Sequence, residues 1–224
     1  FANRDTAAFY DCMAFRDGTH GFAFSDAVNA RMPLVRTSNG RDWVVTQIAA
    51  QAGEGGFAAS GGCAQASADG HAWIVTGAAA TPRVLHSRDG GSSWAATNLP
   101  LVSGAGAGAT AVVFRDSLHG VVVGGAIGGS ATGARVATTQ DGGLTWTVGG
   151  EPPITGALYG LSGGMVAGQW TLIAVGPGGA VVSRDQGATW TLLDGSAYWS
   201  VGFNDRGSVW LVGPRGRVVR VDWR

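Results

Sequence analysis

The chain has 224 residues, 45% of them hydrophobic, which is enough to bury the core of a globular protein. Its 15 basic residues include no lysine and are balanced by 15 acidic residues, so net charge gives no reason to expect binding to nucleic acid or acidic lipid. No segment predicts insertion into a membrane, and no targeting segment is visible. These properties describe a neutral globular protein whose 39 glycines supply many turns.

In chain order, the sequence predicts short β-strands separated by glycine, proline and aspartate turns, with no sustained helical period. The first unit contains the turn Phe-Arg-Asp-Gly-Thr-His-Gly at 15–21, and a related turn recurs at 114–120. Each unit reads as an inner strand, this turn, an apolar strand, a loop, a third strand, a polar box and an outer strand. The units lie near 9–49, 57–99, 108–149 and 157–194, followed by a partial unit at 196–224.

Four polar boxes that end in tryptophan mark the repeat. Three share one spacing, at 87–94, 139–146 and 183–190, and a fourth at 37–43 is one residue shorter. Their tryptophans, Trp43, Trp94, Trp146 and Trp190, stand at intervals of 51, 52 and 44 residues, the range of four-stranded propeller blades. The sequence therefore predicts an all-β propeller with four complete blades and part of a fifth, in one domain over residues 1–224.

The box has a structural explanation in its own residues. We expect its short polar side chain to accept hydrogen bonds from backbone N–H groups two or three residues on, while its glycines take left-handed backbone geometry. The tryptophan is expected to pack against the next blade, where its burial contributes roughly 2–3 kcal/mol. A structural role is therefore favoured over catalysis or metal binding. The acceptor residues are Asn39, Asp89, Asp141 and Asp185.

The pattern Ser-x-Asp-x-Gly-x-Thr-Trp resembles the Asp-box, or BNR repeat, of sialidases, sortilin-type receptors and photosystem II stability/assembly-factor-like propellers. Segments at 9–15, 20–26, 57–63 and 212–217 are similar to a bacterial branch of the assembly-factor-like propellers. The resemblance covers essentially the whole chain. It implies a ring of about seven blades, with residues 1–5 as the tail of an earlier outer strand. It also implies an export signal upstream and a periplasmic or extracellular location.

Propeller geometry places a ligand site on the face built from the loops between second and third strands and from the connections between blades. An arginine recurs at the start of the third strand in three successive units. The expected binding residues are Arg31, Arg83, Arg135, Arg215, Asp26, Glu54 and Glu151. The assembly-factor resemblance implies a non-catalytic platform that binds a protein partner, with the arginines contacting its acidic or carboxylate groups.

The rival hypothesis is a carbohydrate-active propeller, either glycan-binding or a sialidase-like glycoside hydrolase. Sialidases hold a substrate carboxylate with arginines and need a tyrosine nucleophile, a glutamate and an aspartate acid/base. The chain has only three tyrosines, Tyr10, Tyr159 and Tyr198, and lacks the Phe/Tyr-Arg-Ile-Pro motif. No other motif predicts catalysis or a cofactor. The sequence therefore favours a protein that is not an enzyme, with a protein or a glycan as its partner.

Three histidines occupy the same predicted turn in successive blades: His20, His71 and His119, next to Asp17, Asp69 and Asp116. Positions one blade apart do not converge on one ion, so we expect turn packing and no metal site. The fourth histidine, His86, precedes a box, and the sequence reveals no partner for it.

Cys12 and Cys63 take equivalent places on adjacent inner strands. A disulfide needs Cα atoms within about 7 Å, and inner strands of neighbouring blades usually lie farther apart. We therefore expect two buried thiols, with a disulfide as the alternative. Two cysteines alone do not indicate a redox compartment.

Overall fold

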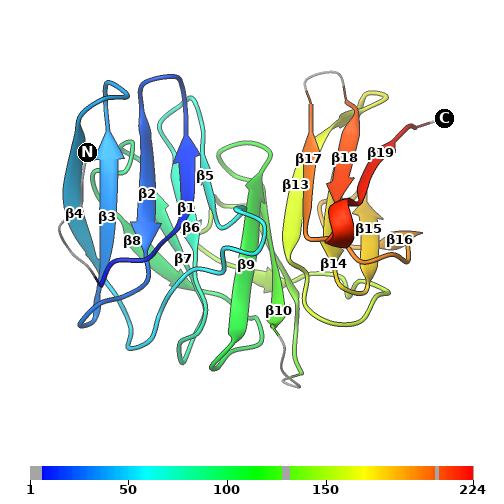
Figure 1. Cartoon of the computed structure of the whole chain (residues 1–224), viewed down its shortest axis with the longest axis horizontal. Coiled ribbons are helices and arrows are strands. Elements are labelled where there is room, and N and C mark those ends of the chain that lie inside the picture. Colours follow the sequence, from blue (N-terminus) through cyan, green and yellow to red (C-terminus); the bar gives the residue numbers. More distant parts are fainter. Residues whose placement is uncertain (1–6, 128–131, 205–206, 224) are drawn as a thin grey trace.

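The computed structural model describes residues 7–127, 132–204 and 207–223, which form five antiparallel sheets in chain order (Figure 1). The first two sheets contain β1 (Tyr10–Phe15), β2 (Gly21–Ser25), β3 (Arg31–Thr37), β4 (Trp43–Ala49), and β5 (Ala64–Ala66), β6 (Ala72–Val75), β7 (Arg83–Ser87), β8 (Ala95–Asn98). The next two contain β9 (Ala107–Phe114), β10 (Gly120–Ala126), β11 (Val136–Thr139), β12 (Thr147–Val148), and β13 (Gly160–Val166), β14 (Gln169–Gly176), β15 (Gly179–Ser183), β16 (Thr191–Asp194). The last contains β17 (Ser200–Phe203), β18 (Val209–Val212) and β19 (Val218–Val221), with a 3₁₀ turn at Pro214–Gly216.

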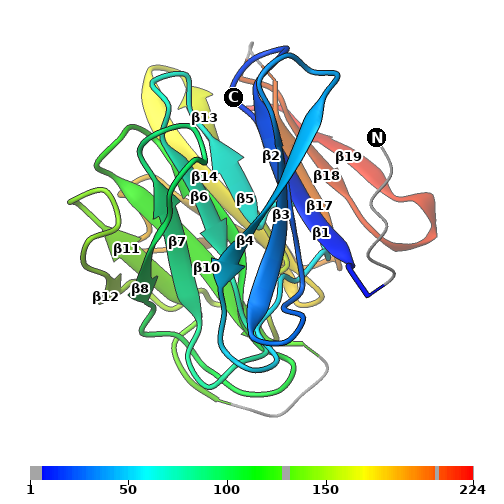
Figure 2. The same cartoon turned by 90° about the vertical axis from the view of Figure 1, so that its left-hand side faces the viewer.

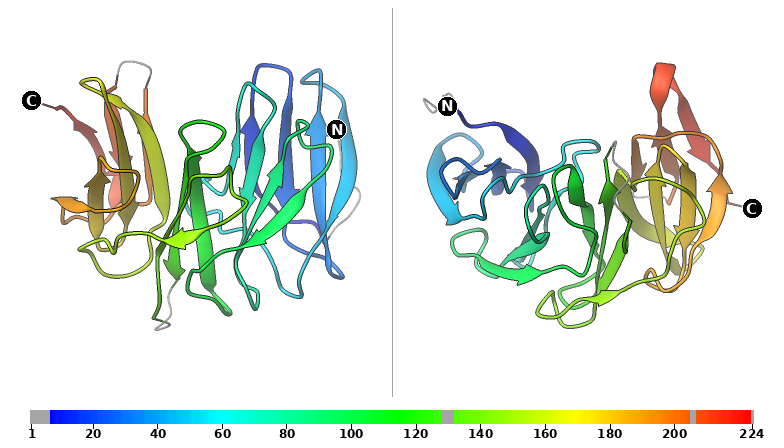
Figure 3. Two further views of the ribbon diagram at one scale, coloured as in Figure 1. Left: turned by 180° about the vertical axis from the view of Figure 1, so that it is seen from behind. Right: turned by 90° about the horizontal axis from the view of Figure 1, so that it is seen from below.

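These sheets, numbered here as blades 1 to 5, stand side by side in an open arc (Figures 1 and 3). Their first strands line the concave side, and the view from below in Figure 3 shows blades 1 and 5 at separate ends. The arrangement is a partial β-propeller of four-stranded blades, which confirms the predicted all-β fold. The described residues contain no helix with the length and apolar character needed to span a membrane. The expectation for residues 1–5 lies outside the described residues.

Each blade buries its apolar side chains mainly against its neighbours. Trp73 and Leu85 of blade 2 are almost completely buried in a cluster that also contains Phe24 of blade 1. Two further clusters join blade 3 to blade 4, and blade 4 to blade 5. Figure 2 looks onto blade 1, whose free face carries the exposed Met13 and Val45. Burial therefore follows the succession of blades along the arc.

The repeated turn and the repeated box are joined by one side-chain arrangement. Because Gly21 has no side chain, the ring of Phe15 lies over it, where an added Cβ would come within 2.5 Å of the ring. The same ring meets Trp43 edge to face, with ring centroids 6.0 Å apart. Blade 3 repeats the arrangement with its own phenylalanine, glycine and tryptophan, at 5.9 Å. In these two blades the glycine after the turn histidine is therefore required by packing, and it links the turn to the box.

The box turns are closed by hydrogen bonds to their own side chains. Asp89 Oδ1 accepts hydrogen bonds from the N–H groups of Ser92 at 3.0 Å and Ser93 at 2.8 Å, three and four residues on rather than the predicted two or three. The Ser93 hydroxyl donates to Asp89 Oδ2 at 2.6 Å. These two groups of Ser93 are the main cause that lowers the pKa of Asp89 to about 2. Asp141 and Asp185 make the corresponding bonds to Thr145 and Thr189.

Trp94 and Trp190 pack toward the preceding blade and not, as predicted, toward the next one. Trp94 of blade 2 meets Phe22 of blade 1 edge to face, with ring centroids 5.3 Å apart. Trp190 of blade 4 is 7% exposed in a cluster that contains residues of blade 3. The Trp94 Nε1–H group donates to the Gly91 carbonyl at 3.1 Å, and this bond holds the indole back over its own box. No hydrogen bond from the described residues reaches Trp190 Nε1, so packing against the preceding blade, and not this bond, is common to the two rings.

Neighbouring backbones touch where the second strand of one blade ends. Gly77 exchanges two N–H···O bonds with Gly55, at 2.9 and 3.2 Å, and an added Cβ on Gly77 would lie 3.0 Å from Gly108 Cα. Two boundaries along, the Leu158 N–H donates to the Gly124 carbonyl at 3.0 Å. Only residues without a side chain allow backbones to approach so closely. These glycines therefore set the spacing between blades.

Cys12 in β1 and Cys63, the residue just before β5, form a disulfide with Cα atoms 5.8 Å apart. This corrects the prediction of two buried thiols. First strands of neighbouring blades approach each other on the concave side of the arc, and these two positions fall within the span of a disulfide. Both residues are at most 4% exposed. The bond thus cross-links blades 1 and 2 inside their shared core.

Replacing both cysteines, as in Cys12→Ala/Cys63→Ala, should lower the free energy of unfolding by about 4 kcal/mol. The reason is that the unfolded chain loses a cross-link between residues separated by 51 positions. Urea unfolding with and without a reductant measures the effect. Reductant should bring the wild-type chain down to the double variant and leave the variant unchanged. Equal wild-type stability in both conditions, once reduction is verified by mass, would contradict the cross-link.

Candidate functional site

The connections between blades and the loops after the second strands gather at one end of the arc, the lower end in Figure 1. We call this end the loop face; the box turns lie at the opposite end. All seven residues predicted for binding lie on the loop face. The structure does not bring them into one cluster, however, because four of them form two separate Arg–Glu pairs at different boundaries.

The first Arg–Glu pair is buried beside blade 2. The Glu54 carboxylate is completely buried and receives the Arg83 guanidinium through Nε at 2.8 Å and Nη2 at 2.5 Å. The Thr76 hydroxyl and the Gln51 N–H donate to the same carboxylate, each at 2.7 Å. Both carboxylate oxygens are therefore satisfied from within the chain. This pair fixes the connection between blades 1 and 2 and presents no carboxylate oxygen to a ligand.

The second pair organises the connection between blades 3 and 4. Arg135, at the start of the third strand, donates through Nε to Glu151 Oε1 at 2.7 Å, and its Nη2 binds the same oxygen. Nη1 donates to the Gly156 carbonyl at 2.5 Å, and Nη2 to the Pro152 carbonyl at 2.9 Å. The Arg135 side chain is 13% exposed and that of Glu151 is 62% exposed. The Arg135 side chain is therefore mostly buried under the connection, and the Glu151 carboxylate reaches the solvent.

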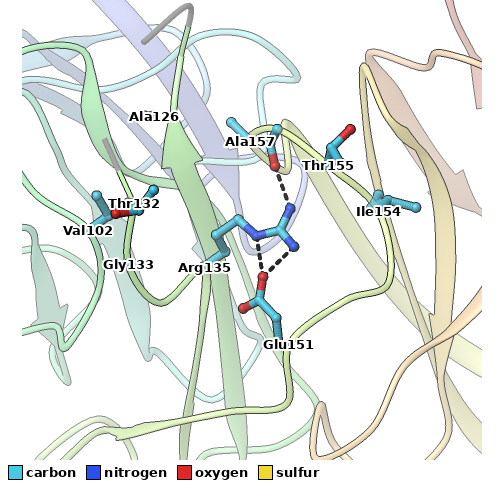
Figure 4. A pocket seen from close by; sticks show the side chains of 10 residues that line it. Val102, Ala126, Thr132, Gly133, Arg135, Glu151, Ile154, Thr155 and Ala157 are labelled. Carbon is cyan, nitrogen blue, oxygen red and sulfur yellow. Dashed lines mark hydrogen bonds and ion pairs between the residues drawn. The ribbon is translucent and has the colours of Figure 1, made fainter. Parts of the chain in front are cut away.

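A pocket of about 410 Å³ opens beside this second pair (Figure 4). Its apolar wall comes from Val102, Ala126, Ile154 and Ala157. Its polar lining comes from the Arg135–Glu151 pair and from Thr132 and Thr155. The volume lies within the ordinary range for a small-molecule or side-chain site. We call it the blade 3–4 pocket.

The remaining predicted arginines stand apart from this pocket. Arg31 is exposed at the start of β3 in the first blade. Arg215 is exposed in the turn between β18 and β19, with a left-handed backbone at φ 58°. Because these two blades form the opposite ends of the arc (Figure 3), the predicted arginines do not meet as a carboxylate clamp.

Asp26 lies beside a second carboxyl group that the sequence analysis missed, that of Asp11. Asp26 Oδ1 accepts the Gly56 N–H at 3.1 Å, and an added Cβ on Gly56 would come within 2.8 Å of Asp11 Cβ. Asp11 Oδ2 is buried, and no donor in the described part of the chain reaches it. Burial, followed by the negative charge of Asp26, raises the pKa of Asp11 to about 7. The two carboxyl groups are thus placed to share one proton.

In blades 1 and 3 the turn histidine contacts the aspartate of its own turn, whereas blade 2 differs. His20 Nδ1 lies 2.9 Å from Asp17 Oδ2, and blade 3 repeats this contact in its own turn. In blade 2, His71 Nδ1 instead lies 2.9 Å from Nε2 of His86, and both rings stack on Trp73. Burial, followed by the charge of His71, lowers the pKa of His86 to about 4. Across the residues that the structure describes, no three His, Cys, Asp or Glu side chains gather to hold a metal ion.

No protein-family model matches the chain, and no curated protein matches its sequence. Its fold does match solved structures. A structure of YCF48 bound to D1 peptide has a TM-score of 0.63 and 20% identity, over 97% of this chain and 67% of that one. A GH74 xyloglucanase from Xanthomonas campestris has a TM-score of 0.62 and 14% identity, over 95% of this chain and 36% of the enzyme. The SapL1 lectin in complex with alpha methyl fucoside has a TM-score of 0.57 and 13% identity, over 97% of this chain and 76% of the lectin.

These similarities show the β-propeller fold alone, since all three identities are low. They include a peptide-bound protein, a glycoside hydrolase and a lectin, so the fold does not choose between protein binding and carbohydrate chemistry. The chain spans about a third of the xyloglucanase. Function must therefore be argued from the side chains on the loop face.

Removing Glu54 should destabilise the fold far more than removing Glu151. Glu54→Ala removes a fully buried carboxylate and leaves the Arg83 guanidinium, the Thr76 hydroxyl and the Gln51 N–H without their acceptor, which costs about 3–5 kcal/mol. Glu151→Ala removes a carboxylate that is 62% exposed, and Arg135 keeps its hydrogen bonds to the Pro152 and Gly156 carbonyls, so the cost is about 1 kcal/mol or less. Urea unfolding of the two variants gives the comparison. Equal losses in the free energy of unfolding would mean that the two glutamates do not differ in burial as described.

Asp11 should make stability depend on pH. Its pKa is about 7 in the folded chain and 3.8 ordinarily, so the folded state binds the proton more tightly than the unfolded chain. The resulting stabilisation is complete below pH 3.8 and is lost as the pH rises through about 7. The thermal midpoint should therefore fall across this interval more steeply in the wild-type chain than in Asp11→Asn. Circular dichroism melts at a series of pH values test this, and parallel curves would rule it out.

Proposed function

We propose that the chain is a non-catalytic binding platform that holds an extended peptide segment of a protein partner on the loop face, at the blade 3–4 pocket. The pocket itself carries the proposal. It combines an apolar wall with two threonines and an exposed carboxylate, which are the kinds of residue that a peptide side chain and its backbone contact. The fold shared with YCF48 bound to D1 peptide lends support, because that propeller carries a peptide ligand.

In this proposal Arg83 and Arg135 hold the connections between blades, whereas the sequence analysis expected them to contact acidic groups of a partner. Arg83 and Arg135 direct most of their N–H groups to Glu54, Glu151 and backbone carbonyls. A sialidase-type clamp would need those same groups for the substrate carboxylate. The arrangement therefore supports binding by the pocket surface rather than by a cluster of arginines.

The carboxyl groups of the loop face also support a platform over a hydrolase. Glycosidases place their two carboxyl groups about 5–5.5 Å or about 6.5–9.5 Å apart, which leaves room for the sugar or a water molecule. Asp11 and Asp26 interact directly through a side-chain hydrogen bond, and Gly56 packs against both. Such a pair is too close for either glycosidase geometry.

Glycan binding is the second candidate function, favoured by one observation. Trp199, before β17, stacks on Tyr159 with ring centroids 5.5 Å apart and is itself 38% exposed. An exposed indole face with a polar edge suits the mixed surface of a sugar. The SapL1 lectin, which has a similar fold, is seen with a fucoside.

We also propose that the chain works outside a reducing cytosol, as the family resemblance implied. The Cys12–Cys63 disulfide lies in the shared core of blades 1 and 2. Structural disulfides of this kind persist in the periplasm and outside the cell. The location agrees with a platform for exported or surface proteins.

Filling the blade 3–4 pocket should abolish peptide binding. Peptides are first selected with the wild-type chain from a random library displayed on phage, and their affinities are then measured by fluorescence polarisation. Thr155→Trp places an indole at the exposed edge of the pocket and should weaken binding at least about tenfold, a loss of about 1.4 kcal/mol.

The matched control is Ala96→Trp, which adds the same ring at an exposed position on β8 of blade 2. It should leave affinity unchanged. Peptides that bind both variants equally well would move the site away from the pocket. If no peptide is selected, while a glycan array gives ligands sensitive to Trp199→Ala, the second candidate takes the place of the first.

A further inference from the structure

The two Arg–Glu pairs of the loop face differ in one chemical respect. Glu54 is completely buried, and its two oxygens together receive four donors. Glu151 is 62% exposed, and both of its contacts with Arg135 reach the same oxygen, Oε1. No donor among the described residues reaches Oε2, which Figure 4 shows turned away from the guanidinium. The blade 3–4 pocket therefore contains one exposed carboxylate oxygen with free lone pairs.

The arginine of the same pair has little left to offer a ligand. A guanidinium has five N–H groups, and Arg135 directs four of them to Glu151 Oε1, the Pro152 carbonyl and the Gly156 carbonyl. A ligand carboxylate entering the pocket would find one N–H group and would face the charge of Glu151. An anionic ligand is therefore disfavoured at this position.

The negative charge of the Arg135–Glu151 pair lies nearer the solvent than the positive charge. Arg135 is 13% exposed and lies beneath the connection, while Glu151 reaches the solvent. The pair is neutral as a whole, but a group that approaches from outside meets the carboxylate first. Among the described residues that line the pocket, Arg135 and Glu151 are the charged ones. A cation bound at Oε2 therefore gains a charge-assisted hydrogen bond, and the guanidinium stays on the far side of the carboxylate.

The wall beside Glu151 suits the stem of a long basic side chain. Ile154 and Ala157 follow Glu151 in the same connection, and Val102 and Ala126 complete the apolar lining. Lysine and arginine pair a methylene stem with a terminal cation, and they bury the stem while the charged end stays near water or a partner. Few other peptide groups match an apolar wall that ends in a carboxylate.

We propose that the blade 3–4 pocket selects a lysine or arginine side chain of the bound peptide, with Glu151 Oε2 accepting its terminal N–H group. The inference rests on the proposed function and adds the class of side chain that the partner presents. It reverses the sequence-based expectation that the loop face binds acidic groups through its arginines.

The test uses peptides selected on the wild-type chain and measures each by fluorescence polarisation at low and high salt. Replacing the basic residue of a peptide with glutamine should weaken binding about tenfold, and glutamate should weaken it further. Higher salt should weaken only the basic peptide. These measurements need no change in the protein, so they hold even where a variant folds poorly.

The protein side of the test is Glu151→Gln, which keeps the size of the side chain and an oxygen for Arg135. It should lose about tenfold in affinity for the basic peptide and nothing for its glutamine analogue. The control, Asp42→Asn, removes one exposed negative charge at the box end and should change neither affinity. Its role is to separate a local effect from a change in net charge.

The failures of the two proposals are distinguishable. If Thr155→Trp blocks binding while Glu151→Gln and the glutamine peptide bind as well as their parents, the pocket binds peptides but not through a basic side chain. Selection of acidic peptides sensitive to Thr155→Trp would overturn the inference in the same way. If no peptide binds, the proposed function falls and the inference falls with it.

Discussion

A blade of this chain becomes buried only when a second blade lies against it. A single sheet of short strands has two faces and too little area to form a core alone. Blades 2, 3 and 4 have a neighbour on each side, whereas the free faces of blades 1 and 5 leave Met13 57% and Trp210 43% exposed. The contacts between blades, more than the hydrogen bonds within them, therefore hold the arc together.

The same contacts create the candidate site. Glycines such as Gly77 and Gly124 bring the backbones together at the loop face, and each connection then crosses the boundary that they set. An arginine at the start of a third strand meets a glutamate of a connection in both Arg–Glu pairs. What differs is depth: one connection lies inside the packing, and the other borders a pocket. A single recurring contact thus serves structure at one boundary and offers a ligand surface at the next.

The repeated motifs made the fold predictable, because their residues act over short distances. The Asp89 turn, the glycine under the Phe15 ring and the alternation of apolar strands are local arrangements that one unit repeats in the next. The predicted direction of Trp94 was wrong because an indole at the end of a turn can lean toward either neighbouring blade, and its packing against Phe22 depends on the tertiary fold. The Cys12–Cys63 distance depends on how closely two blades converge, which spacing along the chain does not report.

The sequence predicted which residues lie on the loop face, but not which of them contact one another. Sequence spacing placed Arg83, Arg135, Glu54 and Glu151 on one face, but the pairing and depth of each pair depend on tertiary packing. Asp11 was visible as a charged residue in an inner strand, yet its contact with Asp26 required the fold. The sequence did not indicate that apolar residues such as Ile154 line a pocket, because an aliphatic residue in a connection is also typical of the hydrophobic core.

The arc is not equally strong along its length, and this has a mechanical consequence. The boundary between blades 1 and 2 carries a covalent cross-link and a buried ion pair, whereas the described residues of blade 5 form three strands that pack on blade 4 without a covalent bond. Tension across the described blades would therefore separate blade 5 from blade 4 before it separates blade 1 from blade 2. A load carried through the first two blades would pass through the covalent bond, whereas a load on the last blade would meet only non-covalent packing.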